Sequence, residues 1–210
     1  MHTGKVESWE LVARILERVV SNLEMARASV KQPQALPTAQ NRFDSSKVPA
    51  ISIYDYFARI HQYADCSESC FILAFIFIDR ALQKNPSFVL SMKSIHRLTL
   101  TAIVLAIKFS DDIYADNVVY SKIGGVALQE LNLLEVEMLN MLQFNLFVSP
   151  QLYLQYLAEL QSHFQQLQVA ASQNESMAIE YEEKCTKPLN PTTSMGSIKT
   201  SPSTNEMAEA

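Results

Sequence analysis

The stretch from Ser91 to Asp112, SMKSIHRLTLTAIVLAIKFSDD, constrains the fold of this chain more than any other. It contains neither Gly nor Pro, and in a helix of 3.6 residues per turn its apolar side chains would cover nearly every side. An amphipathic surface helix would show one apolar stripe and one polar face. The stretch is too short to cross a membrane, and it contains His96, Arg97 and Lys108. We therefore predict a helix that other helices of a soluble bundle surround.

The composition favours the same fold class. Only 4 Gly occur in 210 residues, fewer than a hairpin-rich β protein requires at its turns. The chain is 48% hydrophobic and long enough for one globular domain with a core and tails. A net charge of −5 argues against a general nucleic-acid surface. The 3 cysteines make no disulfide framework, and no secretory signal is visible, so we expect an intracellular protein.

The first part of the chain divides in two. Apolar residues between Glu7 and Lys31 recur at steps of three and four, which predicts an amphipathic helix within an N-terminal segment, 1–31. These residues are Trp9, Val12, Ile15, Leu16, Val19, Val20 and Leu23. The following stretch, 32–48, is rich in proline and polar residues and is predicted to be a linker.

Prolines and polar caps then divide the main domain, 49–171, into helices. Besides the central helix, we predict helices at about 52–64, 70–84, 116–123 and 127–143. A last helix begins at Pro150, with Ser149 as its N-cap. The remainder, 172–210, is rich in Ser, Thr, Pro, Asn and Glu, and we expect it to be disordered.

No catalytic or metal site stands out from the residue types. His61, Cys66 and Cys70 form the only cluster with metal-ligand character, but a structural zinc site needs four ligands and no fourth is near. We therefore interpret them as core residues and expect no metal and no cofactor. No nucleophile, base and acid combine into a catalytic set, so an enzyme with a helical-bundle site is a poor alternative.

Two charged residues near buried helices call for an explanation. Asp79 follows nine apolar residues, and a buried carboxylate without a partner is costly. The preceding helix offers Arg59, so we predict a structural Arg59–Asp79 pair, with a solvent-facing Asp79 as the alternative. Lys108 closes the apolar central helix, where a charge has no role in the core.

Several motifs together resemble the cyclin box. They are PAISIYDYFARI from Pro49, YADCSESC from Tyr63, IDR from Ile78, HRL from His96, AIKF from Ala106, YSKIGGV from Tyr120 and ELNLLEVEML from Glu130. Their order and spacing are similar to those of the phosphate-response branch, the P- or U-type cyclins. The resemblance covers about Val48 to Pro150.

The resemblance implies an all-α fold: a cyclin-like five-helix bundle with an extra N-terminal helix and a C-terminal helix. It also implies a non-catalytic subunit, in the nucleus or cytoplasm, that binds and activates a cyclin-dependent kinase in the cell cycle or a phosphate response. The family's two polar kinase contacts, a Lys ending the third box helix and a Glu in the fifth, look like Lys108 and Glu135. Neighbouring Phe109 would add apolar contact area.

The sequence departs from the cell-cycle cyclins in one respect. Their first box helix carries a Met-Arg-Ala-Ile-Leu patch that docks substrates, whereas this chain has VPAISI from Val48, without Arg. An alternative is a cyclin-fold module that binds nucleic acid or other proteins without a kinase. Only 17 Lys plus Arg count against nucleic acid, and a salt-dependent gel shift would discriminate the two. We expect a kinase partner, with no nucleic acid, membrane or metal.

Overall fold

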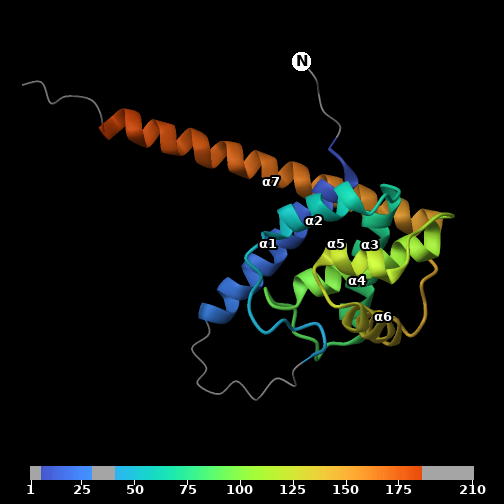
Figure 1. The fold of residues 1–210 in the computed structure, drawn as a ribbon. Helices are drawn as coiled ribbons and strands as arrows, with labels where there is room; N and C mark the ends of the chain where they lie inside the picture. Colours follow the sequence, from blue (N-terminus) through green and yellow to red (C-terminus); the bar gives the residue numbers. More distant parts are fainter. Residues whose placement is uncertain (1–5, 30–40, 186–210) are drawn as a thin grey trace, which may run out of the picture. The chain divides into compact units, whose positions relative to one another are not determined.

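In the computed structural model, residues 6–29 and 41–185 are described, with side-chain positions as far as Val169 (Figure 1). They form α1 (Ser8–Ser29), α2 (Ile53–Tyr63), α3 (Ser69–Lys84), α4 (Ile95–Ser110), α5 (Asn117–Gly124), α6 (Leu128–Leu142) and α7 (Pro150–Cys185). The described residues contain no strand, which confirms the all-α prediction, with α2 to α6 as the five-helix bundle. Residues up to Val169 belong to one compact unit, and those from Ala170 belong to a second.

The central helix is α4, as predicted. Every residue from Ile95 to Ile107 except Arg97 is buried, and α4 packs against α2, α3, α5 and α6 (Figure 1). The polar Thr101 is tolerated because its hydroxyl donates to the carbonyl of Arg97, 2.8 Å away. A helix with apolar residues all round is stable in water only when its neighbours cover each side, and four helices do so here.

The end of α5 lies unusually close to α4. A Cβ atom added at Gly124 would lie 2.1 Å from Cδ2 of Leu100, so a side chain at this position would push the two helices apart. Gly125 follows with φ +68, the left-handed conformation that ends a helix and that glycine adopts without strain. The Gly-Gly pair therefore sets how closely α5 approaches α4.

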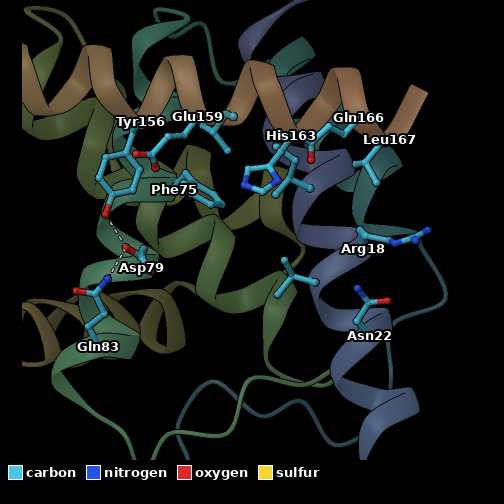
Figure 2. A pocket seen from close by; sticks show the side chains of 13 residues that line it. Arg18, Asn22, Phe75, Asp79, Gln83, Tyr156, Glu159, His163, Gln166 and Leu167 are labelled. Carbon is cyan, nitrogen blue, oxygen red and sulfur yellow. Dashed lines mark hydrogen bonds between the residues drawn. The ribbon is translucent and has the colours of Figure 1, made fainter. Parts of the chain in front are cut away.

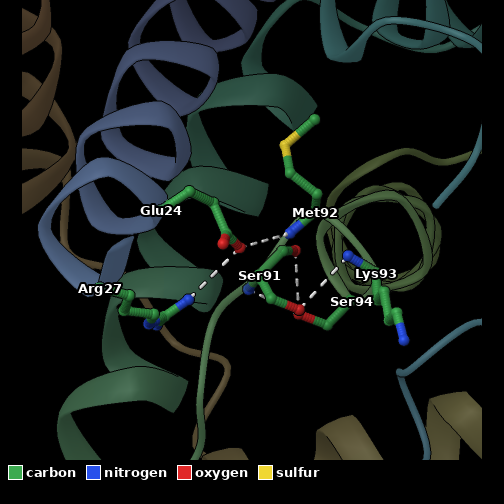
Figure 3. A network of polar contacts seen from close by, with 6 residues as sticks. All are labelled: Glu24, Arg27, Ser91, Met92, Lys93 and Ser94. Carbon is green, nitrogen blue, oxygen red and sulfur yellow. Dashed lines mark hydrogen bonds and ion pairs between the residues drawn. The ribbon is translucent and has the colours of Figure 1, made fainter. Parts of the chain in front are cut away.

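The N-terminal helix packs on the bundle through its apolar stripe. Val12, Ile15 and Leu16 are buried, and α1 contacts α2 and α3. Val19 departs from the predicted stripe, because 39% of it remains exposed. Near the end of α1, the Glu24 carboxylate accepts a hydrogen bond from the Met92 backbone N–H at 3.3 Å (Figure 3). This bond ties α1 to the segment before α4.

The chain between α1 and α2 is anchored in the core where it is described. Phe43 is fully buried and lies edge-on to Phe88, with ring centroids 5.9 Å apart. Arg97 of α4 also donates to the carbonyl of Asp44 at 2.6 Å. Part of the stretch expected to be a linker, 32–48, thus packs as a strap across the bundle.

The predicted Arg59–Asp79 pair is not formed. Arg59 donates to the carbonyl of Lys122 at 3.2 Å, at the end of α5. Asp79 accepts hydrogen bonds from the Tyr156 hydroxyl at 2.6 Å and from Gln83 Nε2 at 2.7 Å. The prediction was wrong because Asp79 lies on the side of α3 that faces α7, whereas Arg59 of α2 reaches toward α5.

The last helix is longer than the sequence pattern indicated. Ser149 accepts from the Leu152 backbone N–H at 3.2 Å, which confirms it as a cap, and α7 then continues to Cys185. The expectation of disorder from residue 172 does not hold for residues 172–185, which are helical. No Gly or Pro interrupts residues 172–185, so nothing in the backbone ends the helix there. The rest of the expected tail, 186–210, lies outside the described residues.

Candidate functional site

The two residues that resemble the family's polar kinase contacts lie side by side. Lys108 lies in the last turn of α4 and Glu135 in the middle of α6, and Lys108 Nζ is 2.6 Å from Glu135 Oε1. The exposed fractions of their side chains are 27% and 13%. The lone charge at the end of the apolar helix thus has a half-buried partner that the sequence analysis did not assign to it.

A third helix contributes to this pair. Asn117, the first residue of α5, donates through Nδ2 to Glu135 Oε2 and to Asn132 Oδ1. Asp116 caps α5 by accepting from the Val119 backbone N–H at 3.1 Å, which fixes where Asn117 begins the helix. The sequence analysis missed Asn117, because an Asp N-cap such as Asp116 indicates where a helix begins but not what the next side chain contacts.

Exposed apolar side chains occur on the same elements as the pair. Phe109 is 48% exposed and touches Phe77 only edge-on, with centroids 6.5 Å apart. Others lie in the loop after α4, on α5 and on α6: Ile113, Tyr114, Val118, Val119, Leu128 and Val136. We call these residues, with Lys108, Phe109 and Glu135, the α4–α6 face. Large exposed apolar groups around a few polar ones are typical of a protein-binding surface.

Asp111, which follows α4 directly, fixes the end of that helix to the segment before α3. Its carboxylate accepts from the backbone N–H of Ser67 at 3.0 Å and from the Ser67 hydroxyl at 2.5 Å. Partial burial opposes ionisation, but these bonds together hold the pKa of Asp111 below its ordinary value. The thiol of Cys70 also donates to Asp111, at 3.3 Å. Lys108 and Phe109 therefore project from a fixed helix end.

The three residues considered as metal ligands are not gathered into one set. His61 Nε2 lies 3.1 Å from Glu68 Oε1 and 3.7 Å from Glu7 Oε2, and its ring stacks on Trp9. Cys66 and Cys70 lie beside Asp111 instead, and hydrogen bonding to Cys70, together with burial, raises the pKa of the Cys66 thiol. Within the described residues, only Glu7, His61 and Glu68 bring three possible ligand atoms together, and they join α1 to the bundle.

Comparison with known proteins decides the family. A family model for cyclins matches residues 7–146, which include α1 and the bundle from α2 to α6. The chain belongs to the cyclin family. Cyclins are regulatory rather than catalytic proteins, so this cyclin has a regulatory role.

Its relatives include plant cyclins of the U and P types. This cyclin is 36% identical over 157 residues to Cyclin-U4-1 of Arabidopsis thaliana, a match that covers 75% of this chain and 76% of the relative. It is 35% identical over 173 residues to Cyclin-P4-1 of Oryza sativa subsp. japonica, covering 80% and 81% of the two chains. The resemblance to the P- and U-type branch is thereby confirmed. Among the helices described for this cyclin, none is both long and apolar enough to span a bilayer.

Proposed function

We propose that this cyclin binds and activates a cyclin-dependent protein kinase through its α4–α6 face. The observation that carries the proposal is a half-buried ion pair, Lys108–Glu135, on elements that also expose large apolar side chains. The apolar groups supply contact area, and the charged pair supplies orientation, which is the usual division of roles in a protein interface.

The pair retains capacity for a partner. A lysine ammonium has three N–H donors, and Lys108 uses one of them for Glu135. Each oxygen of Glu135 accepts one bond, from Lys108 or Asn117, and can accept a second. Both side chains are already held in place, so binding a kinase backbone carbonyl or N–H costs little conformational entropy.

Activation follows from preferential binding to one kinase conformation. In this proposal the α4–α6 face contacts the mobile helix of the kinase. The contact holds that helix where the helix's glutamate pairs with the ATP-site lysine of the kinase, which phosphoryl transfer requires. The cyclin shifts the kinase toward that arrangement because the cyclin binds the active conformation of the kinase more tightly than the inactive one. We propose a role in cell-cycle progression or in a phosphate response, in the nucleus or cytoplasm, and a pull-down from native extract would identify the kinase.

The proposal predicts the effect of removing either charge. Hydrogen bonds from a charged group contribute about 1.5–3 kcal/mol. Lys108→Ala and Glu135→Ala should therefore each weaken kinase binding by about ten- to a hundred-fold and reduce activation in parallel. Kinase affinity and activation are measured with helicity and melting as folding checks. Lys93→Ala is the matched control, because Lys93 is an exposed lysine just before the opposite end of α4.

A charge exchange separates recognition from stability. The double variant Lys108→Glu with Glu135→Lys can keep the ion pair within the fold. A kinase would then meet a negative charge at position 108 and a positive charge at position 135. We expect melting close to wild type and kinase binding as weak as in the single variants. If the exchange restores binding, the pair serves only to hold α4 on α6, and the proposed recognition is wrong.

A further inference from the structure

A groove separate from the α4–α6 face lies between α1, α3 and α7 (Figure 2). Its volume is about 610 Å³, within the range of about 300–1,000 Å³ typical of ligand sites. None of its lining residues belongs to α4, α5 or α6. They are Ile15, Arg18, Val19, Asn22, Phe75, Asp79, Gln83, Tyr156, Glu159, Leu160, His163, Gln166 and Leu167.

One end of the groove is acidic and aromatic. Asp79 Oδ2 accepts from both Tyr156 and Gln83, whereas no hydrogen bond to Oδ1 is found within the described residues (Figure 2). Glu159 lies beside Tyr156 in the same view, and among the described residues it accepts a hydrogen bond from Gln155 alone, at 2.9 Å. Neither carboxylate forms an ion pair with a described residue. Burial and these nearby carboxylates raise the pKa of Tyr156 to about 12.

The nearby cations do not neutralise this end. Arg80 follows Asp79 in the chain, but it donates to the carbonyls of Asn145 and Phe147, at 2.7 and 3.2 Å. Arg18 lines the groove from α1 and lies at the opposite end in Figure 2. Among the described residues, no cation, His163 of the lining included, forms an ion pair with Asp79 or Glu159. The rings of Phe75 and Tyr156, with centroids 6.3 Å apart, offer faces that attract a cation.

The rest of the groove suits an extended apolar segment. Ile15, Val19, Leu160 and Leu167 contribute apolar side chains to its lining, which also includes Arg18, Asn22, His163 and Gln166. Tyr156 and Leu167 are eleven residues apart on α7, or about 16 Å at the rise of an α-helix, which is roughly the length of five extended residues. The lining therefore combines a site for a positive charge with apolar side chains that an extended segment can contact.

We propose that this groove binds a segment of a protein partner in which a lysine side chain lies next to large apolar residues. The ammonium sits between Asp79 Oδ1 and Glu159, against the rings of Tyr156 and Phe75. An arginine fits less well, because its fork prefers two free carboxylate oxygens and Asp79 Oδ2 already accepts two bonds. This surface is independent of the proposed kinase-binding face, so it is tested on the cyclin alone.

The probe is a pool of acetylated, amidated pentapeptides with lysine at the centre and Leu, Phe or Val elsewhere. Titration into the isotope-labelled cyclin should shift amide resonances of α1, α3 and α7 saturably. Replacing the central lysine by Nε-acetyl-lysine should weaken peptide binding at least tenfold. Replacing it by arginine should weaken binding about threefold. Asp79→Asn and Glu159→Gln should each weaken it at least fivefold. Asp112→Asn, at an exposed carboxylate outside the groove, should leave it unchanged.

Several outcomes would overturn the proposal. Resonance shifts that do not saturate would show that the peptides do not bind specifically. Equal affinities of the lysine and acetyl-lysine pools would show that the groove does not recognise the charge. Wild-type affinity in both folded acidic variants would place the binding elsewhere. Glu159→Gln decides the test if Asp79→Asn fails to fold, since Glu159 is exposed. Tighter binding of free spermidine than of the lysine pool would assign the groove to a small polyamine rather than a protein segment.

Discussion

At the scale of single residues, the role of a carboxylate depends on the groups that it contacts, as Glu135 and Asp79 show. Lys108 and Glu135 stabilise one another, and we propose that they keep bonding capacity for a kinase. Asp79 is held by the neutral donors Tyr156 and Gln83, so its charge stays uncompensated at the edge of a groove. A carboxylate that forms no ion pair with a described residue is the more informative of the two cases, because the fold itself does not require the charge.

His96 gives the stability of this cyclin a predictable pH dependence. The ring is buried against Tyr56, and Nε2 donates to the Ile51 carbonyl at 3.0 Å. Burial lowers the pKa of His96 below its ordinary value of 6.5, although the backbone bonds oppose the shift. The unfolded chain therefore binds the proton more readily than the folded one. Stability should be full above about pH 6.5 and fall as the pH drops toward the folded pKa.

The measurement is the free energy of unfolding in urea at several pH values between about 7.5 and 5. His96→Asn should reduce the slope of stability with pH in this range, because the titrating group is gone. His61→Gln is the control: it removes a histidine that lies beside two carboxylates and should not reduce that slope. A wild-type slope in His96→Asn would show that other groups account for the pH dependence.

At the scale of elements, α1 is a part of the domain rather than an appendage. Val12 is fully buried, whereas Val19 on the same helix is 39% exposed. Val12→Asp places a charge where water cannot reach and should cost more than about 3 kcal/mol. Val19→Asp should change stability by less than about 1 kcal/mol. Urea unfolding of the two variants tests this, and equal losses would mean that α1 packs differently.

At the scale of the whole molecule, the family match and the core end in different places. The match ends at residue 146, yet Leu160 of α7 is buried and several residues as far as Leu167 pack on the core. A chain truncated after Val169 should melt within a few degrees of the full chain. Truncation after Ser149 removes those contacts and should lower the melting temperature by at least 5 °C, as expected for a loss of about 2 kcal/mol or more. Similar melting of both truncated chains would show that α7 adds nothing to the fold.

Helix positions and burial were largely determined by the sequence. Helix boundaries follow local signals, such as Ser149 before Pro150 and the Gly124-Gly125 stop, and these act within one turn of the chain. The predicted burial of α4 also held, because a helix with apolar residues on all sides has no other stable environment in water. Lys108 was singled out on the same ground, as a charge that such a helix does not need.

Which charges meet was decided only by the tertiary structure. Lys108 and Glu135 are 27 positions apart and Asp79 and Tyr156 are 77 apart, so their contacts depend on how helices cross. Arg59 and Asp79 lie on consecutive helices, yet they point toward α5 and α7 respectively. Hydrophobic periodicity indicates which face of a helix is buried, but not the rotation and offset that place one polar group within about 3 Å of another.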